Sequence, residues 1–235
     1  MAAPCPSHAE IVILAGGDPV AASWLPGVDA HAWVVAADSG LALMPQLGRP
    51  VDVVVGDLDS VDPELLAEAR RTGSEVMRHP RDKDRTDLAL ALDLALARAP
   101  ARVVVLGGHA GRLDHLLANA LLLASPRYAR LDLVAHVGPA TVTVVRGSAR
   151  LHRRAGQVAS LLPVHGPARG VTTAGLRFPL TDADLHAGTS QGVSNELIDD
   201  TARVDVRDGV LLAVQPGGAR LDADLLPTDH EEDRS

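Results

Sequence analysis

The chain has 235 residues, of which 46% are hydrophobic and 22% are charged, and these values are typical of a folded globular protein. A formal net charge of −8 and only two Trp, one Tyr and one Phe argue against a nucleic-acid partner, which needs a basic surface and stacking platforms. The single cysteine and the lack of any run near the ~20 apolar residues of a membrane span predict a soluble, cytoplasmic protein that is not bound to membranes.

Short apolar runs alternate with helix-like segments up to about residue 138, which is the rhythm of a parallel α/β sheet. Most runs are apolar throughout, as expected for strands covered on both faces. The predicted fold class is therefore a Rossmann-like parallel sheet with helices on both faces. We expect six strands, at Ile11–Ala15, Ala32–Ala37, Val51–Val55, Glu75–Arg78, Arg102–Leu106 and Leu131–Val137.

Helix signals lie between these runs. Asp62 can act as an N-cap, Pro63 as the first helical residue and Gly73 as the terminator of one helix. The next helical segment is apolar nearly all round, so we expect it to be buried against the sheet. The predicted helices are Glu64–Thr72, Thr86–Arg98 and Leu113–Ala124.

After Gly138-Pro139 the helical periodicity ends, and short strand-like runs with Gly punctuation predict a separate all-β domain. The expected strands are Thr141–Val145, Val158–Leu162, Val171–Thr173, Arg203–Arg207 and Val210–Gln215. The predicted organisation is a catalytic nucleotide-binding α/β domain at 1–138, a β-rich domain at 139–222, and an acidic, flexible tail at 223–235.

Polar clusters follow five of the predicted parallel strands. In open α/β sheets, ligands bind beyond the carboxyl ends of the strands, because loop amides and helix N-termini converge there. The sequence therefore predicts one site at this edge. The clusters are Gly16-Gly17, Asp38-Ser39-Gly40, Gly56–Ser60, Lys83–Asp87 and Gly107–Asp114.

The GDLDS cluster is the densest in carboxylates. Alternation along an extended strand end can aim Asp57 and Asp59 at one cation, and hard oxygen ligands suit Mg²⁺. A simpler alternative is an Asx-turn in which Asp59 and Ser60 bond to local backbone N–H groups.

The KDRTD cluster also allows two interpretations. Asp84 as N-cap and Asp87 three residues later resemble a capping arrangement for the following helix. Capping does not explain Lys83, the only lysine of the chain, which stands at a helix N-terminus where anions are attracted. We therefore favour a phosphate contact for Lys83.

The GGHAGRLDH cluster places glycines where a backbone approaches closely, and Arg112 can fork onto phosphate oxygens. The alternative is an ordinary glycine-rich turn with Asp114 on the helix dipole. His109 and His115 lack metal-ligand spacing and are expected to be ordinary helix-end histidines.

Familiar fingerprints are missing or occur in the wrong context. No Walker A motif exists, and no GxGxxG follows the first strand. Gly188–Gly192 fits the GxSxG of serine hydrolases but lacks the strand before it and the helix after it. GDLDS also resembles the start of haloacid-dehalogenase-like phosphatases, with Asp57 as a covalent nucleophile, but the downstream lysine is absent.

Taken in order, seven short motifs strongly resemble thiamine pyrophosphokinase, and they span nearly the whole chain. They are ADSG at 37–40, GDLDS at 56–60, KDRTD at 83–87, GGHAGRLDH at 107–115, SLLP at 160–163, GVTTAGLRFPL at 170–180 and GTSQGVSNE at 188–196. The resemblance implies a catalytic α/β domain, a smaller β-sandwich domain and a homodimer with active sites at the subunit interface. The implied reaction converts ATP and thiamine into AMP and thiamine diphosphate.

Site residues are also implied by the resemblance. The Mg²⁺ ligands would be Asp57, Asp59 and Asp87. The nucleotide-side and catalytic residues would be Asp38, Ser39, Gly40, Lys83, Asp84, Thr86, Gly107, Gly108, Arg112 and Asp114. Thiamine would contact Ser194, Asn195 and Phe178, although the sequence leaves open whether Phe178 stacks on thiamine or packs internally. Ser39 and Leu58 depart mildly from the family pattern, which often has Gly and Phe there.

The expected chemistry is in-line attack of the thiamine hydroxyl on the β-phosphorus of ATP, with positioning and charge stabilisation supplying most of the catalysis. Asp84 and Asp114 are both candidates for accepting the hydroxyl proton. Rival functions are a diphosphokinase for another hydroxyalkyl heterocycle, a phosphatase of the haloacid-dehalogenase type, and a non-catalytic sensor, which the complete acidic set argues against.

Overall fold

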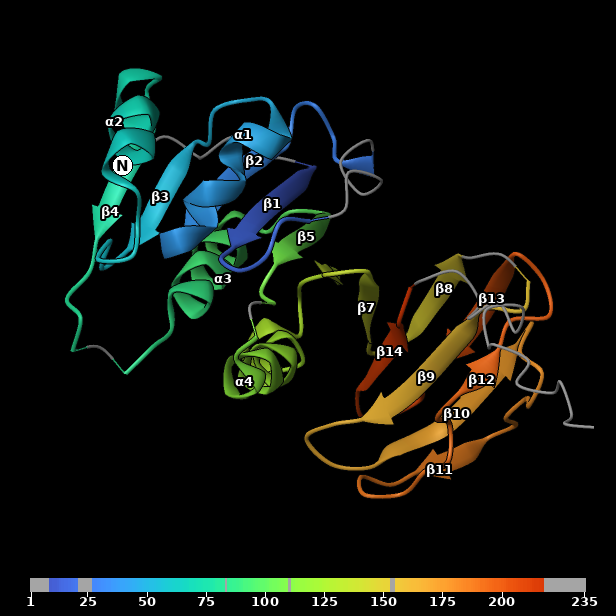
Figure 1. Cartoon of the computed structure of the whole chain (residues 1–235). Coiled ribbons are helices and arrows are strands. Elements are labelled where there is room, and N and C mark those ends of the chain that lie inside the picture. Colours follow the sequence, from blue (N-terminus) through green and yellow to red (C-terminus); the bar gives the residue numbers. More distant parts are fainter. Residues whose placement is uncertain (1–8, 21–26, 83, 110, 153–154, 218–235) are drawn as a thin grey trace, which may run out of the picture.

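The computed structural model describes residues 9–20, 27–82, 84–109, 111–152 and 155–217. Figure 1 shows an α/β half in blue and green and a β-rich half in yellow and red, with the helix α4 between them. The predicted tail at 223–235 lies outside the described residues. None of the described helices is long and apolar enough to cross a membrane.

The α/β half is built on six parallel strands, as predicted. Their order across the sheet is β4-β3-β2-β1-β5-β6, so the chain starts near the middle and winds to both sides. β1, β2, β3 and nearly all of β5 are buried because helices cover both faces, whereas the edge strand β4 has no buried residue. The strands are β1 (Glu10–Ala15), β2 (Trp33–Ala37), β3 (Val53–Gly56), β4 (Glu75–Arg78), β5 (Arg102–Gly107) and β6 (Leu133–Val137).

Alternate residues of the strands face two separate cores. Ile11 and Ile13 of β1 face a core formed with helices α3 and α4, while Val12 and Leu14 face a core formed with α1 and α2. This alternation follows from the period of two in an extended chain. The helices are α1 (Met44–Leu47), α2 (Pro63–Arg71), α3 (Asp87–Arg98) and α4 (Leu113–Leu123), and short 3₁₀ helices lie at Asp38–Leu43 and Pro126–Tyr128.

The N-termini of α2 and α3 show which side chains cap these helices. The Asp62 side chain accepts a hydrogen bond from the Glu64 N–H at the start of α2, as predicted. At α3 the interpretation of KDRTD that makes Asp84 the N-cap is wrong. Thr86 has extended backbone angles and its hydroxyl accepts the Ala89 N–H at 3.3 Å, so Thr86 is the N-cap.

The β-rich half packs two antiparallel layers over its own core. One layer extends the large sheet in the order β12-β9-β14-β7, and the other has the order β11-β10-β13-β8. The strands are β7 (Ala140–Val145), β8 (Ser148–His152), β9 (Val158–Pro163), β10 (Ala168–Ala174), β11 (Ala183–Leu185), β12 (Asn195–Glu196), β13 (Thr201–Asp205) and β14 (Leu211–Gln215). The sequence did not predict β8, β11 or β12.

The two halves share one ten-stranded sheet. β6 and β7 form an antiparallel pair across the Gly138-Pro139 turn, and β7 in turn pairs with β14. The turn therefore falls at the predicted boundary, but the strands on either side of it are hydrogen-bonded to each other. The chain passes from one half to the other without a free linker, while the boundary at 138/139 stays a prediction.

The alternation along β9 gives a stability prediction. Leu161 is fully buried in the core of the β-rich half, whereas its neighbour Leu162 is 37% exposed. Leu161→Ala should lower the free energy of unfolding by ~2–5 kcal/mol, because it removes buried methyl groups and leaves a cavity. The control Leu162→Ala should cost less than ~1 kcal/mol. Urea unfolding followed by circular dichroism measures both, and equal losses would contradict the assignment of strand faces.

Candidate active site

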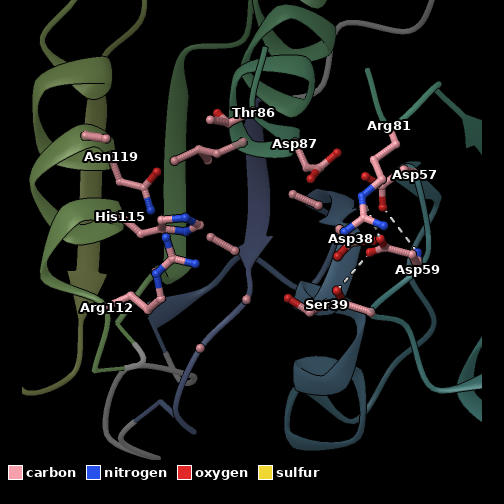
Figure 2. Close-up of a pocket in the computed structure, with 18 residues that line it drawn as sticks. Asp38, Ser39, Asp57, Asp59, Arg81, Thr86, Asp87, Arg112, His115 and Asn119 are labelled. Atoms are coloured by element: carbon pink, nitrogen blue, oxygen red, sulfur yellow. Dashed lines mark hydrogen bonds and ion pairs between the residues drawn. The ribbon is translucent and has the colours of Figure 1, made fainter. Parts of the chain in front are cut away.

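A cavity of about 420 Å³ opens at the carboxyl edge of the parallel sheet. It takes its lining from the loops that follow β1, β2, β3, β4 and β5, so five separate strand ends meet at one place. Figure 2 shows acidic side chains on one wall and Arg112, His115 and Asn119 on the opposite wall. The lining residues predicted from sequence are Asp38, Ser39, Asp57, Asp59, Thr86, Asp87, Gly108 and Arg112.

The acidic wall contains a tight carboxylate cluster. Among the described residues, Asp38, Asp57 and Asp59 each place an oxygen so that these atoms all lie within 4.8 Å of one another. Asp38 and Leu58 both have left-handed backbone, with φ of 46° and 65°, and the Leu58 N–H donates to the Asp38 carboxylate at 3.0 Å. The turn after β3 is thus bonded to the turn after β2, which fixes the spacing of the three carboxylates.

The turn at GDLDS has an Asx bond, but it is made by Asp57 and not by Asp59 and Ser60 as the alternative expected. The Asp59 N–H donates to the Asp57 carboxylate at 3.2 Å, and the Ser60 hydroxyl donates to the Asp59 carboxylate at 3.0 Å. Both carboxylates still line the cavity, so the turn bonds orient them and leave other lone pairs for a ligand. Arg81 lies 3.5 Å from Asp59 and supplies a positive charge at the rim.

Asp38 is the most buried of the three clustered carboxylates. Burial raises the pKa of its carboxyl, and the nearby carboxylates of Asp87 and Asp57 raise the pKa further, against the lowering effect of bonds from backbone N–H groups. Its exposed fraction is only 8%. A bound cation would relieve this cost, because an opposite charge nearby favours the ionised form.

Asp87 approaches the cluster from α3. It is the first residue of that helix and lines the cavity, and a Cβ added at Gly56 would lie 3.0 Å from its Oδ1 and 3.0 Å from the Asp38 Cβ. The missing side chain at Gly56 therefore lets two acidic elements approach each other. The group within 4.8 Å therefore contains Asp38 beside the predicted ligands Asp57 and Asp59, whereas the third predicted ligand, Asp87, lines the same cavity but is not part of that group.

The opposite wall is one face of α4. Arg112, His115 and Asn119 follow a spacing of three and four residues, which places them on the same side of a helix, and Figure 2 shows all three turned towards the cavity. The sequence reasoning missed Asn119 and treated His115 as an ordinary helix-end residue. Their helical spacing from Arg112 was the signal that could have identified them.

Asp114 does not line the cavity. Its carboxylate accepts a hydrogen bond from the Arg112 Nε at 3.1 Å and a second from Nη2. The bond from Arg112 lowers the pKa of Asp114 to about 2, with the charge of Arg112 acting in the same direction. Such a carboxylate is a weak proton acceptor, and its place favours orienting Arg112.

Gly40, Gly107 and Asp84, three other predicted nucleotide-side residues, do not line the cavity. Gly40 and Gly107 permit close packing, since an added Cβ would lie 1.9 Å from the Leu14 carbonyl oxygen and 2.1 Å from the Ala15 carbonyl oxygen, respectively. Asp84 is exposed. Lys83 lies outside the described residues.

The three predicted thiamine residues belong to the β-rich half and do not line this cavity. Asn195 is buried, and its side chain accepts from the Phe178 N–H at 3.0 Å and donates to the Phe178 carbonyl at 2.7 Å. Phe178 itself is 62% exposed, so within this chain its ring does not pack internally. Ser194 is exposed, and its N–H donates to the Ser160 hydroxyl at 3.0 Å.

Acidic and basic walls that face each other at the carboxyl edge of a parallel sheet suit a highly charged, phosphorylated ligand. The class that this fold and this cavity define is that of enzymes that transfer phosphate-containing groups. Residues 27–135 match the family model described as thiamin pyrophosphokinase, catalytic domain, and residues 148–211 match thiamin pyrophosphokinase, vitamin B1 binding domain. The chain belongs to the thiamine pyrophosphokinase family.

Individual relatives extend the match over most of the chain. A thiamine pyrophosphokinase of Bacillus subtilis is 25% identical over 214 residues, which cover 87% of this chain and 97% of the relative. The crystal structure of a thiamin pyrophosphokinase from Geobacillus thermodenitrificans has a TM-score of 0.75 at 25% identity and covers 89% of this chain and 98% of its own. A Bacillus subtilis structure shares the fold with a TM-score of 0.78 at 23% identity, covering 89% of this chain and 100% of its own.

The raised pKa of Asp38 predicts a pH-dependent stability difference in the metal-free protein. A carboxyl whose pKa is higher in the folded than in the unfolded chain destabilises the fold when ionised, and this cost vanishes as the pH falls below both values. In EDTA at pH 7, Asp38→Asn should therefore melt a few degrees above the wild type, and the gap should close towards about pH 4. Differential scanning fluorimetry measures the midpoints. A lower midpoint for the variant at pH 7 would contradict the argument.

Proposed function

We propose that the chain transfers a diphosphate group from ATP to the hydroxyl of thiamine, giving AMP and thiamine diphosphate. The observation that carries the proposal is the cavity in which the Asp38, Asp57 and Asp59 carboxylates face Arg112 and His115. The family match adds the identity of the acceptor, because one half matches a catalytic domain and the other a vitamin B1 binding domain. It also leaves the phosphatase alternative without support.

The carboxylate cluster fits a divalent cation of the Mg²⁺ type. Its donors are hard oxygens that can meet at one point, and Asp87 lies on the same wall. In this proposal Asp57, Asp59 and Asp87 hold Mg²⁺, with Asp38 close enough to serve as a further ligand. A cation held by these residues would neutralise charge on phosphate oxygens and act as a Lewis acid.

The chain's own groups would bind and align the polyphosphate. Arg112 can present its remaining N–H groups to phosphate oxygens while Asp114 holds the guanidinium in place. His115 and Asn119 add donors from the same helix face, and the N-terminus of α3 at Thr86 favours negative charge. Because these donors are fixed before the reaction, they stabilise developing charge at little reorganisation cost.

A homodimer forms the second part of the proposal. The described residues that line the cavity all lie between 15 and 119, so Ser194, Asn195 and Phe178 of the same chain do not reach it. The helix α4 lines the cavity with one face and exposes Leu113, Leu117 and Leu121, which recur every four residues. A second copy related by a two-fold axis would cover these leucines and bring its own Phe178 towards the cavity.

The proposed substrates are small molecules, and the proposed location is the cytoplasm, where Mg²⁺ and ATP are supplied together. The runner-up function, a diphosphokinase for another hydroxyalkyl heterocycle, keeps the same cavity and differs only in the acceptor. Competition between thiamine and other heterocyclic alcohols, measured as AMP release, separates the two functions.

The reaction itself is tested by incubating the protein with Mg-ATP and thiamine and separating the products. We expect AMP and thiamine diphosphate in equal amounts, and Asp57→Asn should lower turnover at least about 100-fold while the fold survives, because it removes a charged ligand. Asp62→Asn is the matched control, since asparagine is also a good N-cap and Asp62 is not part of the cavity. ADP with thiamine monophosphate, or AMP release that ignores thiamine, would refute the proposal.

The composite site is tested by mixing two inactive variants. Asp57→Asn disables the α/β half and Phe178→Ala disables the thiamine side, so each homodimer should be nearly inactive. Random mixing of subunits gives heterodimers with one intact site, and about a quarter of the wild-type rate should return. The control pair Asp57→Asn and Asp87→Asn lies within one half and should recover nothing. Without recovery in the first mixture, the cavity would have to be completed within one chain.

A further inference from the structure

Asp93 contacts three polar groups nearly two turns along α3 from Asp87, at a point that does not line the cavity. Its carboxylate forms ion pairs with Arg85 and with the Arg127 Nε at 2.8 Å, and it lies 3.2 Å from the Tyr128 hydroxyl. The Asp93 side chain is only 21% exposed, so these contacts are partly shielded from water. Asp93 does not line the cavity, and the mechanism proposed above makes no use of it.

Tyr128, which contacts Asp93 in this cluster, is buried and hydrogen-bonded. Tyr128 is the only tyrosine of the chain and is 1% exposed, and its hydroxyl also lies 3.2 Å from the Ala89 carbonyl oxygen in α3. The 3₁₀ helix that carries Tyr128 and Arg127 begins at a capped residue, where the Ser125 hydroxyl accepts the Arg127 N–H. Asp93 is therefore held from one side by a buried, hydrogen-bonded element.

The Arg85 side of the cluster leads to the cavity. Arg85 directly precedes Thr86, the N-cap of α3, and its guanidinium folds back along the helix to Asp93 and to within 3.4 Å of the Ala89 carbonyl oxygen. The residue before an N-cap often packs against the first turns of its helix and so fixes the angle at which the chain enters. In this chain the ion pair between Arg85 and Asp93 takes the place of that packing contact.

We propose that Asp93 is a positioning residue for the catalytic cavity: through Arg85 it fixes the entry of the chain into α3, and thereby the places of Thr86 and Asp87 on the cavity wall. The inference rests on the proposed function for its catalytic readout. Thr86 and Asp87 are the two residues that follow Arg85, and both line the cavity. A displacement of about 1 Å at a reacting site can lower the rate about 100-fold, so a contact outside the cavity can control turnover.

The ion pairs of Asp93 allow a matched comparison. Arg85→Ala and Asp93→Asn both cut the link to the chain entry, whereas Arg127→Ala removes the other arginine of the same carboxylate and leaves that link intact. We expect Arg85→Ala and Asp93→Asn each to lower kcat about 10–100-fold and to raise the Mg²⁺ concentration needed for half-maximal rate. The double variant should be no worse than either single variant, because both cut one link. Arg127→Ala should stay within about threefold of the wild type, and Arg85→Lys should recover part of the loss.

Two further measurements separate this inference from the proposed reaction. Calorimetric titration with Mg-ATP needs no thiamine, and the Kd should rise in Arg85→Ala and Asp93→Asn alone. Amide hydrogen exchange of residues 84–90 needs no ligand, and protection should fall in the same two variants. A wild type that fails to make thiamine diphosphate would remove the proposed reaction and leave these two readouts in force. Unchanged kcat, Kd and protection in Asp93→Asn, or equal losses in Arg127→Ala, would overturn the positioning role.

Discussion

The carboxylates of Asp38, Asp57 and Asp59 are held with oxygens within 4.8 Å of one another, and much of the α/β half serves to keep them there. Like charges at such distances repel unless donors or a cation compensate. The N–H groups of Leu58 and Asp59 and the guanidinium of Arg81 supply part of that compensation. These donors stay in place because β2 and β3 are buried parallel neighbours whose ends are in register. A slip of one residue between them would move the Leu58 N–H away from the Asp38 carboxylate.

Because the two halves share one sheet, strand hydrogen bonds hold the β-rich half in its position relative to the cavity. β7 is bonded to β6 on one side and to β14 on the other, and a His165 ring nitrogen lies 2.8 Å from the Leu121 carbonyl oxygen at the end of α4. The β-rich half cannot swing its own Phe178 to the cavity without breaking strand hydrogen bonds. A second copy is the simpler source of a thiamine-binding surface, and the exposed leucines of α4 give that copy an apolar face to cover.

Local signals made most of the α/β half predictable. Continuous apolar runs marked the parallel strands, and Asp62 and Pro63 marked the start of α2. Non-local features were not predictable in this way: β12 has two residues, and its pairing with β9 depends on a partner more than thirty positions away. Asp38 reaches the carboxylate cluster because its backbone is left-handed, and an aspartate in the sequence does not by itself predict that conformation. Thr86 caps α3, whereas one interpretation of KDRTD placed the N-cap at Asp84, because both side chains are suitable acceptors and only the backbone path selects one.

A loop that carries a functional side chain must be fixed by contacts at a place where the ligand does not bind. Asn195 lies on β12, and its amide oxygen accepts from the N–H groups of Phe178 and Glu196 while its nitrogen donates to the Phe178 carbonyl. Asp93, on α3, holds Arg85 in a comparable way. In each case the holder belongs to a regular element and the residue that it fixes belongs to a loop. From the sequence alone, an asparagine such as Asn195 could either contact the substrate or hold a neighbouring loop in place. In this chain Asn195 is 3% exposed and its amide bonds to the main chain, whereas the Phe178 ring is 62% exposed, so the fold itself uses Asn195 to hold the loop, while its contact with thiamine stays a prediction.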